Sequence, residues 1–383
     1  MNETRALPGT PAGATTLDEG ASTVNQTKRL GVGIIGCGVG QLHLRGFTHE
    51  PRAHVVAIAG LDQDRCHELA RAFGVPNVYR EYQQLLADPA VEAVTVAVPN
   101  ALHYPVALAA LQAGKHVLVE KPLAPSVEEG QQIIDAARRT ERVLGVIFNR
   151  RGRHDVQIVK RQVERGALGR IYHARAFWLR RSGIPGLGTW FTSKSMAGGG
   201  PLIDLGIHVL DMAIWVLGNP APVRVSAATY AELGPCGRGQ WQGGRFSFNP
   251  AAPYDVEDYA TALIRFENGL TMQLDASWAA YTGHGDEFGI SLLGSDGGAE
   301  IHVKDYAQTG TLRLYGELDG VPTVTEPRLQ ERDNHGEIFK SFTDSVLEGL
   351  PMSPSGEEGL ERVRLIEALY RSAELGREIE IRG

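Results

Sequence analysis

The stretch "LGVGIIGCGVGQLHL", residues 30–44, starts as an apolar strand and turns through glycines into a helix. The same alternation of apolar runs and amphipathic segments continues to Asn149. Strands interleaved with helices build βαβ units, so residues 29–150 are predicted to form an α/β domain with a doubly wound parallel sheet. The expected strands are 31–36, 54–60, 93–98, 116–119 and 143–148, and the expected helices are 40–49, 64–73, 81–87, 102–113 and 126–139.

Three glycines, Gly36, Gly38 and Gly40, lie where the first strand gives way to the first helix. Main-chain N–H groups at such a turn, together with the helix dipole, can hold a pyrophosphate. The loop, including Val39, is therefore the expected dinucleotide-binding turn of a Rossmann domain. An ordinary βα turn without a ligand is the alternative. A literal G-x-G-x-x-G match that begins at Gly31 lies inside the strand and is discounted.

The ribose side of a dinucleotide site is expected after the second strand, which ends near Gly60. Asp62 follows two residues later and could accept hydrogen bonds from the adenosine ribose, or it could be a solvated turn residue. No arginine directly follows the strand to bind a 2′-phosphate, although Arg65 is near. The sequence therefore favours NAD slightly, with NADP possible.

A second domain is expected after Arg150, because strands then follow one another with little helix between them. The dipeptide Asn268-Gly269 is typical of a tight hairpin. Residues 151–383 are predicted to form an α+β domain with a large, mostly antiparallel open sheet. A sheet with helices on only one face leaves a broad face to bury, so we expect a homodimer or homotetramer. Helices are expected at about 154–166, 203–217, 334–348 and 357–375.

Bulk composition excludes several classes of protein. The 383 residues are 43% hydrophobic and 22% charged, which is globular and long enough for two domains. A net charge of −7 argues against a nucleic-acid or anionic-membrane partner. No apolar run approaches the roughly 18 residues of a membrane span. Residues 1–28 lack the apolar core of a signal peptide and are expected to be a mobile tail, so a cytoplasmic protein is predicted.

The number and spacing of the cysteines also favour a cytoplasmic protein. The three cysteines, Cys37, Cys66 and Cys236, are an odd and widely spaced set. This pattern is typical of a reducing compartment and argues against a disulfide framework or a cysteine-based zinc site. Cys37 is interpreted as a small residue that fits the glycine loop.

Three segments together are far more specific than the glycine loop. They are "VTVAVPNALHYPVALAALQAGKHVLVEKPLA", "FNRRGRHDVQIVKRQVERGALGRIY" and "GGGPLIDLGIHVLDMAIWVLG". In that order and spacing they resemble the glucose–fructose oxidoreductase/inositol dehydrogenase/MocA (Gfo/Idh/MocA) family, from about Leu30 to the C-terminal "EALYRSAELGREIEI". The resemblance implies an oxidoreductase that uses NAD or NADP on sugars or cyclitols, with a Rossmann domain, an open-sheet domain and no metal. The early third glycine and Gly60 depart from the family pattern and leave the cofactor preference open.

The first catalytic candidate is Lys121, which follows the buried run Val117–Val119. At a strand's carboxyl end it can point into the crevice and hydrogen-bond or relay a proton at a substrate hydroxyl. Pro122 fixes the backbone behind it, and the resemblance implies a cis bond there. Glu120 could orient the lysine or contact the cofactor. A solvated lysine at the end of a strand is the alternative.

Asp204 and His208 are four residues apart on a predicted helix and so share one face. His208 is the expected general base, because the pKa of histidine ordinarily lies near neutral pH. Asp204 could orient the substrate hydroxyl or stabilise the imidazolium. The alternatives are a structural histidine and a metal site that includes Asp211, and the resemblance implies no metal.

Other residues are expected around the same crevice. Pro99, Asn100 and His103 plausibly contact the nicotinamide, although His103 could instead cap its helix. Arg150 and Arg151 could bind substrate oxygens or be salt-bridged hinge residues. Weaker pocket candidates, chosen as aromatic or cationic residues of the second domain, are Trp178, Arg180, Arg181, Trp190 and His284.

The sequence thus predicts an enzyme that transfers hydride between nicotinamide and a secondary hydroxyl or ketone of a sugar, sugar derivative or cyclitol. Its expected catalytic residues are Lys121, Asp204 and His208. A redox-neutral enzyme that cleaves glycosides by oxidation and elimination is a related alternative. A non-catalytic sensor of NAD(P) or sugar is a third reading, which would predict loss of the catalytic residues.

Overall fold

The first sheet of the computed structural model follows the alternation seen in the sequence. Over the described residues (29–241, 254–283, 285–331, 333 and 335–381), six parallel strands form it in the order β3-β2-β1-β4-β5-β6. The order reverses between β1 and β4, which is the switch point where ligands of doubly wound sheets bind. The strands are β1 (Leu30–Ile35), β2 (Ala53–Ala59), β3 (Asn77–Tyr79), β4 (Ala93–Val96), β5 (His116–Glu120) and β6 (Leu144–Ile147).

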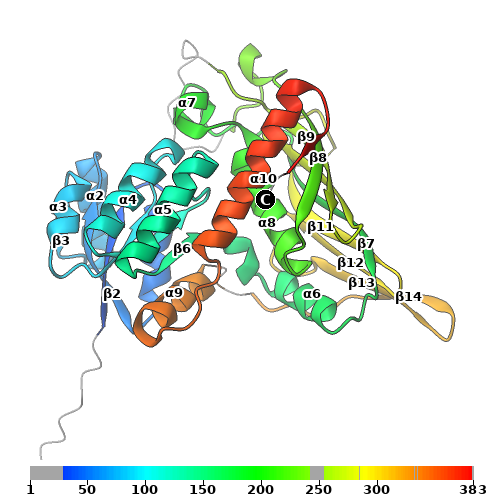
Figure 1. The fold of residues 1–383 in the computed structure, drawn as a ribbon, viewed down its shortest axis with the longest axis horizontal. Helices are drawn as coiled ribbons and strands as arrows, with labels where there is room; N and C mark the ends of the chain where they lie inside the picture. Colours follow the sequence, from blue (N-terminus) through cyan, green and yellow to red (C-terminus); the bar gives the residue numbers. More distant parts are fainter. Residues whose placement is uncertain (1–28, 242–253, 284, 332, 334, 382–383) are drawn as a thin grey trace, which may run out of the picture.

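Helices flank this sheet on both sides (Figure 1). Their ends follow local capping chemistry: Ser126 accepts the N–H of Glu129 where α5 begins, and Asp62 accepts the N–H of Arg65 where α2 begins. The sheet and its helices confirm the predicted Rossmann domain; only the three-residue β3 was not expected. The helices are α1 (Gly40–Thr48), α2 (Gln63–Phe73), α3 (Tyr82–Ala87), α4 (His103–Gln112) and α5 (Val127–Thr140).

The second sheet has nine strands within the described ranges, in the order β14-β13-β12-β11-β7-β10-β9-β8-β15. Only the β7–β10 pair is parallel among these strands, so the mostly antiparallel sheet is confirmed. Asn268-Gly269 turns β9 into β10 as predicted. The strands are β7 (Ile171–Arg180), β8 (Pro222–Tyr230), β9 (Tyr259–Phe266), β10 (Thr271–Ser277), β11 (Asp286–Gly294), β12 (Gly298–Lys304), β13 (Leu312–Leu318), β14 (Val321–Thr325) and β15 (Ile379–Glu380).

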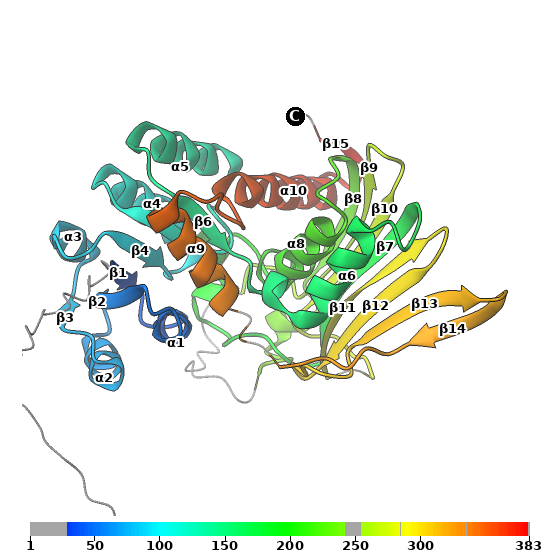
Figure 2. The same cartoon turned by 90° about the horizontal axis from the view of Figure 1, so that it is seen from below.

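Helices cover one face of the second sheet, the face turned toward the Rossmann domain (Figure 2). These are α6 (His154–Glu164), α8 (Ile207–Val216) and α10 (Gly356–Leu375). No described helix lies on the opposite face in this view. The stretch Lys194–Val216, which contains the short α7 (Lys194–Ala197) and α8, is long and apolar enough to cross a membrane, but 83% of its most apolar window is buried. Such burial is that of a core helix.

The helix α9 (Gly336–Glu348) packs on the Rossmann domain rather than on the second sheet. The ring of Phe339 lies 4.6 Å from that of Phe47 on α1, and Arg52 pairs with Asp344. The apolar face of α9, which follows β14 in sequence, thus completes the core around β1.

Candidate active site

Lys121 and Asp204 meet at the boundary between the two domains. Lys121 follows β5 directly, and its Nζ lies 2.8 Å from Asp204 Oδ1 and 2.9 Å from the Asp204 carbonyl oxygen. The Lys121–Pro122 peptide is cis, as the resemblance implied. The two side chains are only 13% and 19% exposed, so water screens this pair weakly.

The carboxylate of Asp204 is held at both oxygens. Its Oδ2 accepts a hydrogen bond from Trp278 Nε1 at 2.9 Å, while Oδ1 faces Lys121. Burial alone would raise the pKa of Asp204, but Lys121, Arg180 and Trp278 outweigh burial and lower it. Asp204 therefore stays ionised and anchors Lys121, and its lowered pKa makes it a weak proton acceptor.

A π-helical turn, Leu202–Gly206, presents Asp204 ahead of α8. Such turns are rare and frequently occur at functional sites. The buried carboxylate of Glu257 accepts the N–H groups of Gly200 and Leu202 at 2.9 and 3.0 Å, and Tyr370 donates its hydroxyl to the same carboxylate at 2.8 Å. These bonds hold the backbone in place at Gly200 and Leu202, where the chain enters the π turn.

His208 lies in the first turn of α8, with its ring centroid 5.8 Å from that of Trp178. Its Nδ1 is buried without a hydrogen-bond partner in the described part of the chain. Burial, then the positive charges of Lys121 and Arg150, lower the pKa of His208 well below the ordinary 6.5. His208 is therefore neutral at neutral pH, which suits a base, but the expectation that it titrates near neutrality is wrong.

Arg150 and Arg151 are adjacent, yet their side chains have different partners in the structure. Arg151 donates to both oxygens of Asp211, at 2.8 and 2.6 Å, and to Glu358 at 2.7 Å. Arg362 contacts the same Asp211 at 3.1 Å. These bonds hold the Arg151 guanidinium within the protein, in agreement with the alternative that Arg151 is a salt-bridged hinge residue. They also engage both carboxylate oxygens of Asp211, so Asp211 is not available as a metal ligand. No group of three potential metal ligands occurs among the described residues.

Arg150, in contrast, has no carboxylate within ion-pair distance among the described residues. Its guanidinium lies over three rings, 4.7 Å from Trp178, 4.6 Å from Phe288 and 5.5 Å from Tyr306. Its Nε is buried and unpartnered there, and burial lowers the pKa of Arg150 to about 10. Buried polar groups are normally bonded, so this open donor indicates a ligand atom.

Glu120 belongs to a hydrogen-bonded chain beneath the lysine. Its Oε1 lies 3.0 Å from His43 Nε2, and its Oε2 accepts the N–H of Lys121 at 3.2 Å. The other ring nitrogen of His43 meets Thr95 Oγ1 at 3.0 Å. Burial would raise the pKa of Glu120, but the bond from His43 and the charge of Lys121 lower it. Glu120 thus orients the backbone that carries the lysine.

His103 supports the same backbone from the other side. Its Nδ1 lies 2.6 Å from the Pro122 carbonyl oxygen and its Nε2 lies 3.0 Å from the Val98 carbonyl oxygen. Burial lowers the pKa of His103, so the ring is neutral and donates to one carbonyl at a time. The side-chain amide of Asn100 donates to the Ala197 carbonyl at 2.8 Å. Both side chains are therefore occupied within the protein.

The glycine loop has open space beside its backbone at Gly38. Gly36 has φ +108°, and a Cβ added at Gly38 would meet nothing within 4 Å. Val39 gives α1 no side-chain cap, and no acidic residue occupies the first turn, so no acidic side chain of that turn neutralises the positive end of the helix dipole. The N–H groups of Gln41 and Leu42 already bond to the carbonyl oxygens of Gly38 and Val39. Gly33, by contrast, lies in β1, where a Cβ would come within 2.6 Å of Leu85.

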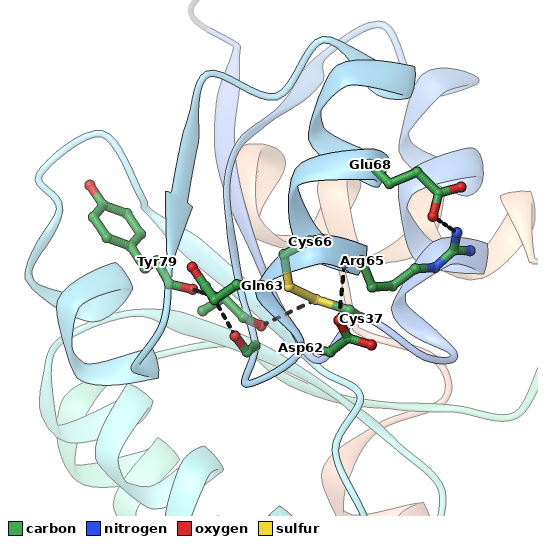
Figure 3. The surroundings of a disulfide bond; sticks show 9 residues. Cys37, Asp62, Gln63, Arg65, Cys66, Glu68 and Tyr79 are labelled. Carbon is green, nitrogen blue, oxygen red and sulfur yellow. Dashed lines mark hydrogen bonds and ion pairs between the residues drawn. A yellow bond between two sulfur atoms is a disulfide. The ribbon is translucent and has the colours of Figure 1, made fainter. Parts of the chain in front are cut away.

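Asp62 and Arg65 lie at the start of α2 (Figure 3). The exposed carboxylate of Asp62 accepts the Arg65 N–H through Oδ1 at 3.0 Å. The Arg65 guanidinium donates to Gln41 Oε1 at 2.7 Å and to Glu68. Asp62 thus caps α2 through Oδ1, while its Oδ2 has no hydrogen bond within the described part of the chain.

A disulfide joins Cys37 to Cys66, with their Cα atoms 5.8 Å apart. The prediction that the cysteines are unpaired is wrong for these two, because β1 and β2 are neighbours and bring the loop after β1 against α2. The cysteine count therefore no longer supports a reducing compartment. Cys236 is free and exposed.

The weaker pocket candidates differ in burial. Trp178 is buried and donates to Asp286 at 2.7 Å, and the same carboxylate binds Arg180 at 2.8 Å. Trp190 stacks on Phe191 at 3.8 Å. Arg181 is exposed, and His284 lies outside the described residues.

Four residues near the site were not predicted from the sequence. His43 lies in "GQLHL" and Trp278 in "DASWA", each close to a strand's carboxyl end, and that position was the available signal. Asn149 and His335 bond to each other at 3.0 Å, and Asn149 Oδ1 is buried without a partner in the described ranges. Burial lowers the pKa of His335 to about 4. No local pattern predicts that α9 delivers His335 to this place.

Comparison with known proteins agrees with this geometry. Residues 30–148 match the family model described as "Oxidoreductase family, NAD-binding Rossmann fold", and residues 156–300 match the GFO/IDH/MocA C-terminal domain. The chain is 34% identical over 360 residues to D-glucoside 3-dehydrogenase of Escherichia coli, covering 92% of this chain and 97% of that protein. It is 27% identical to myo-inositol 2-dehydrogenase of Thermotoga maritima, over 91% of this chain and 98% of that one.

Solved structures give the same result. A complex of levoglucosan dehydrogenase with NADH superposes with a TM-score of 0.82 at 27% identity, over 93% of this chain and 100% of the other. Levoglucosan dehydrogenase of Pseudarthrobacter phenanthrenivorans is 30% identical over 90% of this chain and 96% of that protein. The chain therefore belongs to the GFO/IDH/MocA family and is an NAD-binding oxidoreductase that acts on CH–OH groups.

Proposed function

We propose that the protein reversibly oxidises a secondary hydroxyl of a sugar, sugar derivative or cyclitol with NAD. One observation carries the proposal: Lys121 and Asp204 pair across the domain boundary, and the charge of Lys121 acts on a buried, neutral His208 whose Nδ1 has no hydrogen-bond partner among the described residues. A cation beside a neutral base is the arrangement needed to take a proton from an alcohol and hold the resulting oxygen.

Each residue of this group has a distinct task. His208 accepts the hydroxyl proton, because its buried ring is neutral and unpartnered. Lys121 donates a hydrogen bond to the same oxygen and can relay the proton onward. Asp204 fixes Lys121 and keeps the local charge balanced, in place of orienting the substrate hydroxyl directly. The nicotinamide, when bound, supplies the hydride acceptor.

The substrate would lie against Arg150 and Trp178. Arg150 has an open buried donor for a substrate oxygen, and Trp178 offers an aromatic wall beside His208. We assign Arg151 to structure, because Asp211 and Glu358 hold its guanidinium. The stacked Trp190 stays a candidate for the outer part of the pocket.

The cofactor would be held by the chain as follows. The N–H groups of the Gly36–Gly40 loop, with Val39, face the pyrophosphate, and the free oxygen of Asp62 serves the adenosine ribose. Arg65 is tied to Gln41 and Glu68 and is therefore poorly placed for a 2′-phosphate, which favours NAD over NADP. Pro99 and the backbones of Asn100 and His103 would border the nicotinamide.

A screen of polyols, aldoses, keto-sugars and glycosides with NAD and NADP tests the proposal. We expect NADH absorbance to rise with at least one sugar or cyclitol, and NADH to bind at least as tightly as NADPH. Binding of NADH without turnover of any of these substrates would contradict catalysis and favour a sensor. Release of a free sugar without net NADH would replace the proposal by oxidation–elimination.

The bare face of the second sheet leads to a prediction on assembly. The described helices cover its inner face alone, and a polar cluster on the outer face places Asp275 between Thr261 and Tyr259, with 3% of Asp275 exposed. We expect two chains to pair through this outer face in a homodimer or homotetramer. Light scattering at micromolar concentration checks this, and a monomer would contradict it.

A further inference from the structure

The Cys37–Cys66 disulfide lies within the expected dinucleotide site (Figure 3). Cys37 stands between Gly36 and Gly38 of the glycine loop, and Cys66 lies in the second turn of α2. Cys37 is 8% exposed and Cys66 is fully buried. The bond therefore ties the loop that would face the pyrophosphate to the helix that begins beside the adenosine ribose.

The two sulfurs also shape the end of β2. A Cβ added at Gly60 would lie 2.6 Å from Cys37 Sγ and 2.9 Å from Cys66 Sγ. The disulfide thus occupies the space of any side chain at position 60. Only glycine fits there, and the nearest acid for the ribose is Asp62.

Reduction would release the loop rather than the helix. Gln63 donates to the carbonyls of Gly60 and Tyr79 at 2.7 and 3.2 Å, so the start of α2 keeps its place without the sulfurs. Cys37 has glycines on both sides, and Gly38 has open space around it. The hydrogen bond from Arg65 to Gln41, at 2.7 Å, would still join α2 to the segment after the loop.

We propose that Cys37–Cys66 is a thiol–disulfide exchange site whose oxidation state sets the affinity for the dinucleotide. A dithiol reductant attacks Cys37, the more exposed sulfur, and Cys66 leaves as a thiolate that takes a proton. The second thiol of the reductant then displaces Cys37, so two electrons and two protons pass to the protein and the reductant becomes a disulfide. The inference rests on the cofactor site and is independent of the substrate.

The oxidised form should bind NADH more tightly, because its loop is ordered before the ligand arrives. Reduction should weaken binding by about tenfold, roughly the effect of ordering one further backbone residue. Linkage requires the reverse effect as well: bound NADH should disfavour reduction of the disulfide by the same factor.

Thiol counting and NADH fluorescence titration on the full-length protein test this. Unfolded under non-reducing conditions, the oxidised protein should show one reactive thiol, Cys236, and after dithiothreitol three. The Kd for NADH should rise about tenfold on reduction and return on reoxidation. The double variant Cys37→Ser/Cys66→Ser should bind weakly with or without dithiothreitol, while Cys236→Ser should keep the full response.

Two results would overturn the proposal. One is three thiols in the protein prepared without reductant and exposed to air. The other is an unchanged Kd once thiol counting shows complete reduction, with circular dichroism confirming the fold. Because wild type is compared with itself, a folding defect of the serine variant cannot decide the outcome. Failure of NADH to bind either form would instead overturn the cofactor site itself.

Discussion

His208→Asn is expected to lower kcat by about 10²–10⁴-fold while leaving the affinity for NADH nearly unchanged. Asparagine keeps a polar side chain of similar reach but cannot take the hydroxyl proton. The Nδ1 atom of His208 has no hydrogen-bond partner among the described residues, so its loss leaves no donor or acceptor of these residues without a partner at that atom. Steady-state kinetics with saturating NAD, beside an NADH titration, measures both quantities.

The pH profile separates a base from a structural histidine. Because burial and nearby cations lower the pKa of His208 well below 6.5, the ring stays neutral through the neutral range. Activity should fall only in acid, as pH drops through that lowered pKa, and this acid limb should disappear in His208→Asn. The exposed His67 of α2 provides the control variant, His67→Asn, which should keep both rate and profile. Near-normal turnover of His208→Asn would show that the proposed mechanism is wrong.

Lys121→Met should reduce kcat by a similar 10²–10⁴-fold, because methionine fills the space but donates no hydrogen bond to the substrate oxygen. Among the described residues, the Asp204 carboxylate would then keep only its bond from Trp278, so some loss of thermal stability is also expected. Combining Lys121→Met with His208→Asn should cost far less than the product of the two losses, since both groups act on one hydroxyl.

A lysine at the other end of the same strand gives the matched control. Lys115 precedes β5 and donates to the carbonyls of Val91 and Asp88 at 2.6 and 3.2 Å, away from the site. Lys115→Met should lower stability without changing kcat. Fully multiplicative losses in the double variant, or near-normal kcat in Lys121→Met, would refute a shared role at one oxygen.

Local patterns predicted most of the fold and the proposed catalytic residues. Alternating apolar runs determine where strands and helices form, and a spacing of four places Asp204 and His208 on neighbouring turns. The π turn before α8 was not predictable, and neither was the contact beside it, in which Glu257 from a distant segment binds the N–H groups of Gly200 and Leu202. The pKa of His208 likewise depends on charges delivered by other elements.

Local sequence patterns do not predict which partner each of two adjacent arginines contacts. Nothing local distinguishes Arg150 from Arg151, yet one faces aromatic rings and the other binds Asp211. The Cys37–Cys66 bond was missed for the same reason, since it depends on β1 and β2 being neighbours. These errors concern contacts between segments, which periodicity does not encode.

The position of α9 constrains how the chain can fold during synthesis. Arg52 and Asp344 are 292 residues apart in sequence, yet they pair, and Phe339 packs on Phe47 in the same core. The Rossmann domain is encoded first, but part of its apolar core, the part supplied by α9, is still missing when the domain leaves the ribosome. The helix α9, which completes this core, is synthesised only after eight of the nine described strands of the second sheet, β7 to β14, have been translated. Until then the exposed patch on α1 is a place where chaperones can bind and premature chains can aggregate.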